Sequence, residues 1–280
     1  MSREAEFQKL VVMTGANLSE TDYQRLVRAA KILENPGLAT RISELVGMPI
    51  EKAMTALPGH WSSIVGRITK AALEKALDSA LYTLDRRRPK YPSKKVHKLL
   101  AGASGAVGGT LGIATLAIEL PVSATIMLRS IGDIARSKGE NLDALETRMA
   151  CLQVFALGGG KESADAADTA YYAARSLLAK AIGDSSKHIA AKGLAKEGAP
   201  AMVKLLNAVA ARFSNPVSEK LAAQSVPLVG AIGGASLNLI FIEHFQALAE
   251  AHFDVRRLER RYGAEVVKQA YSAINLAIFL

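Results

Sequence analysis

The chain has 280 residues, of which 50% are hydrophobic and 5% aromatic, and its 35 basic and 26 acidic residues give a net charge of +9. This hydrophobic share excludes a disordered chain. Abundant alanine and leucine favour helices over strands, so we expect an all-α fold: a single multi-helix domain with two glycine-rich apolar helical segments at its centre. The one cysteine, Cys151, excludes an internal disulfide and is typical of a reducing compartment.

The first ninety residues predict several helices with clear ends. Residues 1–15 lack the apolar run of a signal peptide, so we expect a cytoplasmic protein. Ser19 with Asp22 resembles an N-terminal cap for a helix that ends near Glu34, before the sequence NPG. Pro49 and Pro58-Gly59 separate two short helices, and apolar spacing predicts a long amphipathic helix over 62–84.

We expect two regions, an N-terminal helical region over 1–92 and a glycine-rich helical core over 93–280, in one continuous domain. The sequence DRRRPKYPSKKVHK, residues 85–98, is the linker between them. It favours contact with an anionic membrane surface, and a solvated loop is the alternative. Nucleic acid is not expected as a partner, because stacking aromatics are not interleaved with these charges. Its basic residues are Arg86, Arg87, Arg88, Lys90, Lys94, Lys95 and Lys98.

Two uncharged, glycine-containing stretches form the expected core, 99–118 and 221–242. Both contain the pattern G-A-x-G-G, which indicates either a degenerate repeat or a chance match. No lysine follows the glycines as a phosphate loop requires, and no nucleophile elbow is present. Small residues one turn apart allow close helix packing in lipid or in a protein core. The ligand-binding or helix-packing candidates are Gly105, Gly108, Gly109, Gly112, Gly230, Gly233, Gly234, Arg129 and Asn238.

Beyond the first apolar stretch we expect a polar helix end over 129–137 and helices over 142–157 and 163–181, with a break at residues 158–160. Asn215-Pro216 predicts the start of another helix. After the second apolar stretch, a charged helix carries a second basic cluster. Its members are Arg256, Arg257, Arg260 and Arg261.

A few acidic and histidine side chains are candidates for chemistry. Glu119 lies between apolar neighbours, so it must face a polar interior, be protonated or be paired. Asp133 shares a helix face with Arg129 and could pair with it. Glu243, His244 and His252 form a second group. Catalytic candidates are therefore Glu119, Asp133, Glu243 and His244, but no zinc-binding spacing supports a metal site.

Several segments in order resemble the EcsC protein family of bacteria: ILENPGL, VGMPIEKAMTALP, a glycine-rich segment closing in AIELP, LRSIGDIARSKGE, CLQVFALGG, GGASLNLIFIEHF and HFDVRRLERRYG. The resemblance extends from about residue 25 to 270. It implies a bacterial cytoplasmic setting, and it provides no catalytic residues that can be carried over to this chain. Because the founding member is encoded beside an ABC transporter, it also implies a membrane-protein partner of that kind. Some relatives carry names that suggest a protease, but neither a zinc motif nor a triad pattern occurs here.

These observations predict a peripheral membrane protein at the inner face of the cytoplasmic membrane. It would contact an anionic membrane surface or a membrane protein and bind a lipid, another apolar ligand or a membrane-protein helix. We expect no cofactor and no metal. One alternative is a hydrolase or metal-dependent enzyme that uses the Glu, Asp and His residues above. Another is a scaffold in which both apolar stretches are ordinary core helices.

Overall fold

The computed structural model describes residues 18–34, 37–55, 57, 59–83, 113–157, 169–192, 200–226 and 230–279. Within these ranges the chain forms ten helices and no strand, which confirms the predicted all-α domain. The helices are α2 (Glu20–Glu34), α3 (Leu38–Val46), α4 (Ile50–Thr55), α5 (Trp61–Thr83), α7 (Ile113–Ser137), α8 (Leu145–Leu157), α9 (Ala170–Lys192), α10 (Pro200–Gln224), α11 (Gly230–Tyr262) and α12 (Ala264–Phe279).

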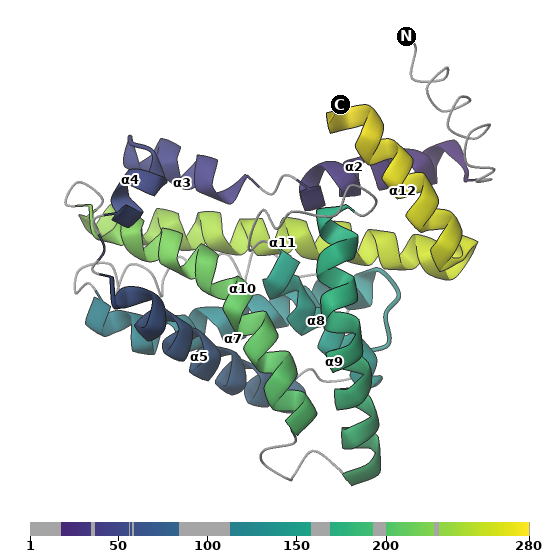
Figure 1. The fold of residues 1–280 in the computed structure, drawn as a ribbon, viewed down its shortest axis with the longest axis horizontal. Coiled ribbons are helices and arrows are strands. Elements are labelled where there is room, and N and C mark those ends of the chain that lie inside the picture. Colours follow the sequence, from purple (N-terminus) through teal and green to yellow (C-terminus); the bar gives the residue numbers. More distant parts are fainter. Residues whose placement is uncertain are drawn as a thin grey trace.

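Helix α11 is the central element of the fold. It has 33 residues and runs along the long axis of the molecule in Figure 1. Helices α2 and α3 pack along one side of it, and α7 and α8 pack along another. At its far end, α12 folds back over α11 and α2. One long helix thus contacts most of the others, so its side chains can connect distant parts of the sequence.

Four helices form a bundle at one end of the molecule. Helices α5 and α11 each pack against both α7 and α10. Helices α5, α7 and α11 begin, and α10 ends, at this same end (Figure 1). Because α5 and α11 lie between them, α7 and α10 face each other across the bundle interior.

Four buried phenylalanine rings pack together where α8 meets α10 and α11. Phe155 of α8, Phe213 of α10 and Phe241 and Phe245 of α11 are buried, with ring centroids 4.7 to 6.0 Å apart. These rings bury large apolar areas and prefer such tilted contacts. They fix how α8, α10 and α11 pack together.

The helix ends follow local chemistry. Ser19 Oγ accepts a hydrogen bond from the backbone N–H of Asp22 at 3.3 Å, which confirms the predicted cap of α2. Gly139 after α7 has φ 84° and Gly263 between α11 and α12 has φ 93°, a left-handed backbone that side chains disfavour. These two glycines allow the chain to reverse direction onto α11.

The predicted helix start at Asn215-Pro216 is wrong, because α10 passes through both residues. Pro216 removes one backbone hydrogen bond, a cost that usually ends a helix. Its neighbours Phe213 and Val217 are fully buried, and this packing keeps the helix continuous. Helix α9 also extends beyond its predicted end near 181, and its predicted start at 163 lies outside the described residues.

Candidate functional site

Glu119 lies on the inner side of α7 and forms an ion pair with Lys220 of α10, with 2.5 Å between Oε1 and Nζ. Both side chains are buried, Lys220 completely. Gln224 places Nε2 3.5 Å from the second oxygen, Oε2. Burial lowers the pKa of Lys220, and the attraction of Glu119 offsets only part of that effect. Lys220 is thus the partner that the apolar sequence around Glu119 requires.

Other buried groups lie on the helices of the same bundle. The ring of Phe241 lies 5.4 Å from Lys220 Nζ. Ser123 lies one turn after Glu119 on the buried face of α7, and Thr69 lies on the buried face of α5 that packs against α7 and α10. Neither hydroxyl has a hydrogen-bond partner.

The other two predicted carboxylates contact cations of their own. Asp133, near the end of α7, accepts a hydrogen bond from Arg136 Nη1 at 3.2 Å. Glu243 of α11 pairs with Arg41 of α3 at 2.5 Å, and both of these side chains are partly exposed. Glu119, Asp133 and Glu243 are thus each paired with a different cation.

The remaining predicted side chains are dispersed. His244 is buried with its ring 4.8 Å from that of Phe245, Asn238 is buried on α11, and Arg129 is half-buried on α7. In the part of the chain that the structure describes, no group of three or more His, Cys, Asp or Glu side chains is arranged to hold a metal ion.

Many of the predicted packing and membrane residues lie outside the described ranges. Gly230, Gly233 and Gly234 form the start of α11. Among the helices that the structure describes, none combines the length and apolar composition that crossing a bilayer needs. The residues outside the described ranges are Gly105, Gly108, Gly109, Gly112, Arg86, Arg87, Arg88, Lys90, Lys94, Lys95 and Lys98.

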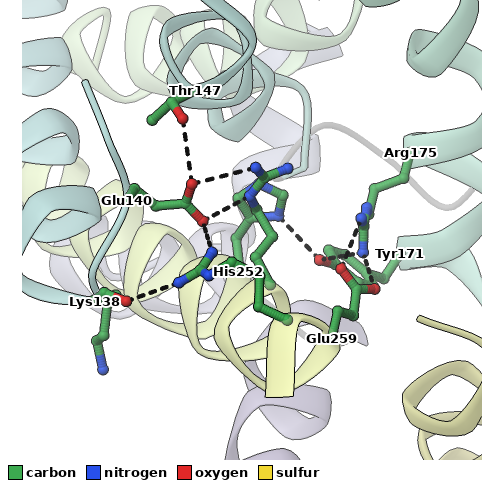
Figure 2. Close-up of polar contacts among 9 residues, drawn as sticks. Lys138, Glu140, Thr147, Tyr171, Arg175, His252 and Glu259 are labelled. Atoms are coloured by element: carbon green, nitrogen blue, oxygen red, sulfur yellow. Dashed lines mark hydrogen bonds and ion pairs between the residues drawn. The ribbon is translucent and has the colours of Figure 1, made fainter. Parts of the chain in front are cut away.

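A second cluster of buried charges joins the connection between α7 and α8 to α11 (Figure 2). Glu140 accepts hydrogen bonds from Arg256 Nε at 2.9 Å, Arg256 Nη2 at 3.3 Å and Thr147 Oγ1 at 3.3 Å, and it also pairs with Arg260. Burial raises the pKa of Glu140, but the two arginines outweigh it and leave the pKa below its ordinary value. Arg260 also donates to the backbone carbonyl of Lys138 at 2.9 Å.

The adjacent contacts join α9 to α11. Arg175 donates to Tyr171 Oη at 3.2 Å and binds both carboxylate oxygens of Glu259, at 2.6 and 3.1 Å (Figure 2). Tyr171 Oη also forms a hydrogen bond with His252 Nδ1, 3.0 Å away. Burial and the charges of Arg175 and Arg256 hold the pKa of His252 well below its ordinary value, so the ring is neutral.

The second basic cluster is mostly engaged within the fold. Arg256 and Arg260 bind Glu140, and Arg261 binds Asp22 of α2 at 2.7 Å. Arg257 is exposed. Three of the four arginines therefore stabilise the packing of α11 against its neighbours.

Cys151 has the environment of a core residue. It is buried in α8, and burial together with the negative charge of Glu140 raises the pKa of its thiol to about 12. Since the thiolate is the reactive form, this thiol is inert at neutral pH.

A family model matches the chain from the start of α2 through most of α11. The model of the EcsC protein family covers residues 20–258. The chain belongs to the EcsC protein family. No curated protein and no solved structure matches it.

In this EcsC family member, sequence reasoning singled out Glu119 but missed its partner. Lys220 follows Phe213 and Val217 at helical spacing, so it occupies an otherwise apolar face of α10. A lysine on an apolar helix face and an acid in an apolar stretch elsewhere were the sequence signal that could have predicted this buried ion pair. Glu140 was also missed because it lies in an ordinary polar stretch, and Arg175 was missed because one arginine among alanines and leucines is typical of an amphipathic helix.

Proposed function

We propose that this EcsC family member docks peripherally on an anionic membrane surface and binds lipid there, through the outer side of α7 and the basic residues of segment 85–98. One observation carries the proposal. Ile118 is 74% exposed and Val122 is 47% exposed, and the two lie one turn apart on the same side of α7. Large aliphatic side chains exposed together favour an apolar contact.

The charge distribution along the chain also supports membrane docking through the outer side of α7. Segment 85–98 has seven basic residues and one acidic residue, so it contributes +6 of the net charge of +9. The uncharged run 99–118 follows it directly and ends at the exposed Ile118. Basic residues near an anionic bilayer contribute about 1 kcal/mol each. Charge and apolar surface are thus adjacent in the chain, as in proteins that lie on membranes.

The enzyme alternative has weaker support. General acid–base or metal chemistry needs a carboxylate that is available to a proton or a cation. The buried Glu119 and Asp133 are already held by Lys220 and Arg136. We therefore favour binding over catalysis.

Vesicle flotation tests the apolar part of the proposal. The full chain should float with vesicles of phosphatidylcholine and phosphatidylglycerol, and Ile118→Gln/Val122→Gln should reduce recovery several-fold. Leu177→Gln/Leu276→Gln is the matched control, since those leucines are 64% and 57% exposed on α9 and α12. Equal recovery of the two double variants would refute the claim that the outer side of α7 contacts the membrane.

Charge variants test the electrostatic part of the proposal, the attraction of segment 85–98 to anionic lipid. Changing Arg86, Arg87 and Arg88 to Gln should lower recovery on anionic vesicles about tenfold or more, given about 1 kcal/mol per residue. The exposed Lys31, Lys180 and Lys204 give a control triple with the same change in charge. If the unmodified chain binds neutral and anionic vesicles equally, the electrostatic part is wrong.

A further inference from the structure

The four bundle helices lack charged residues at the end where α5, α7 and α11 begin and α10 ends (Figure 1). Four stretches without Asp, Glu, Lys, Arg or His meet there, namely 61–66 of α5, 113–118 of α7, 221–226 at the end of α10 and 230–242 of α11. We call these residues the uncharged end. Farther along, α7 carries Arg129, Asp133 and Arg136, and α11 is rich in charged residues from Glu250 onward. Charge is thus excluded from one end of the bundle.

The first charged side chains beyond the uncharged end are compatible with an apolar layer beside it. On α7 and α10 they are Glu119 and Lys220, which are buried and neutralise each other. On α5 it is Arg67, which is exposed and can approach lipid phosphates. Glu219 is half-buried, and its pKa is raised to about 7 by burial and by the charge of Glu51. Helix α4, beside this end, carries one acidic and one basic residue.

The uncharged end exposes apolar side chains from more than one helix. Ile118 of α7 is 74% exposed and Leu239 of α11 is 36% exposed. Trp61, the only tryptophan of the chain, is half-buried at the start of α5. Tryptophan is enriched where proteins meet the bilayer interface. The six-residue stretches of α5 and α7 extend about 9 Å, which matches the depth of about 5 to 10 Å to which interfacial segments enter a bilayer.

We infer that the uncharged end enters the boundary between the lipid headgroups and the acyl chains. This orientation rests on the proposed function, and it extends the lipid contact from the outer side of α7 to the ends of all four helices. Because α7 and α10 face each other across the bundle interior, contact through the outer side of α7 alone would keep the end of α10 away from lipid. The two arrangements therefore differ at Ser225, which is exposed directly after α10.

Fluorescent labels on single introduced cysteines test the orientation. Cys151 is buried and inert, so Ile118→Cys, Ser225→Cys and Leu276→Cys can each be labelled selectively with a dye that reports local polarity. The full chain is mixed with vesicles of phosphatidylcholine and phosphatidylglycerol. We expect the emission to shift to the blue for labels at positions 118 and 225 and to stay unchanged at position 276, which is exposed on α12.

Each pattern of shifts has its own meaning. A shift for Ile118→Cys without one for Ser225→Cys would overturn the inference and keep docking through the outer side of α7. A shift for Ser225→Cys alone would refute the α7 contact and keep the uncharged end as the lipid-contacting surface. Equal shifts at all three positions would overturn the inference, since they indicate adsorption without a fixed orientation. In the unmodified chain, Trp61 fluorescence should be quenched by dibrominated phosphatidylcholine, and unquenched Trp61 in a chain that floats would contradict the inference.

Added charge tests the same contact by flotation. Ser63→Glu/Ser225→Glu places two carboxylates at exposed positions of the uncharged end and should lower recovery about tenfold, because a charge in an apolar layer is costly. Ser137→Glu/Ser176→Glu adds the same charge at exposed positions of α7 and α9 and is the control. Equal recovery of the two variants would contradict the inference. So would a dimer of the unmodified chain that Ser63→Glu/Ser225→Glu dissociates in sedimentation, because a second copy would then cover this end.

Discussion

Arg256 binds Glu140 through two N–H groups, Nε at 2.9 Å and Nη2 at 3.3 Å, although the two residues are 116 positions apart. Glu140 lies in the connection between α7 and α8, and Arg256 lies on α11. Such two-point guanidinium contacts are stronger and more directional than single hydrogen bonds. The contact, reinforced by Arg260, holds the α7–α8 connection against the central helix.

Glu140→Gln should loosen that connection. The change leaves Arg256 with a neutral partner in a mostly buried position, and we expect a loss of about 2 to 4 kcal/mol in the free energy of unfolding. Hydrogen exchange of residues 138–144 should become faster. Asp254→Asn, which breaks a more exposed pair with Lys138, should have a smaller effect. Equal exchange rates in both variants would contradict the role of Glu140.

The same contact predicts acid sensitivity. The pKa of Glu140 is below its ordinary value of 4.5 in the folded state. Its contribution to stability is therefore complete above pH 4.5 and is lost as the pH falls through the folded-state pKa. When urea unfolding is measured at several pH values, the free energy of unfolding of Glu140→Gln should fall less in acid than that of the unmodified chain.

The Glu119–Lys220 pair predicts strong non-additivity. Lys220→Met alone leaves a buried carboxylate without its cation and should cost about 3 to 5 kcal/mol. Glu119→Gln/Lys220→Met removes both charges, so its cost should be well below the sum of the single changes. Urea unfolding of the four proteins measures this coupling. The exposed pair Arg41–Glu243 is the control and should couple by less than about 1 kcal/mol.

The raised pKa of Glu219 in α10 predicts a loss of stability as the pH rises toward neutral. Burial, together with the charge of Glu51, raises its pKa from 4.5 to about 7. The folded state thus binds the proton more tightly than the unfolded state, and stability falls as the pH rises from about 4.5 to about 7. Glu219→Gln should remove this decline and gain about 1 to 2 kcal/mol at pH 8. Glu51→Gln should shift the decline to lower pH, and an unchanged pH profile in Glu219→Gln would contradict the assignment.

His252 predicts the opposite dependence on pH. Its folded-state pKa is well below 6.5, so its neutral form stabilises the fold fully above pH 6.5, and that stability is lost as the pH falls below 6.5. His252→Gln keeps a side chain that can hydrogen-bond to Tyr171 but does not titrate. The difference in unfolding free energy between the unmodified chain and this variant should shrink by up to about 1.4 kcal/mol per pH unit below 6.5. His60→Gln, at an exposed position, is the control for the substitution.

The sequence alone determined the all-α class, the cap at Ser19 and the need of Glu119 for a partner. Helix propensity, capping and the cost of a lone buried charge are local properties, so they are encoded in neighbouring residues. The continuity of α10 through Pro216 was mispredicted for the same reason, because the packing that overrides a proline is not local.

Only the tertiary structure decided which charges meet. Lys220 is 101 positions from Glu119 and Arg256 is 116 positions from Glu140, and both contacts depend on where helices cross. Likewise, apolar periodicity predicted that α7 packs, but not that Ile118 and Val122 stay exposed while Thr69 and Ser123 are buried without partners. Which side of a helix is covered depends on its neighbours in space, and helix periodicity carries no information about them.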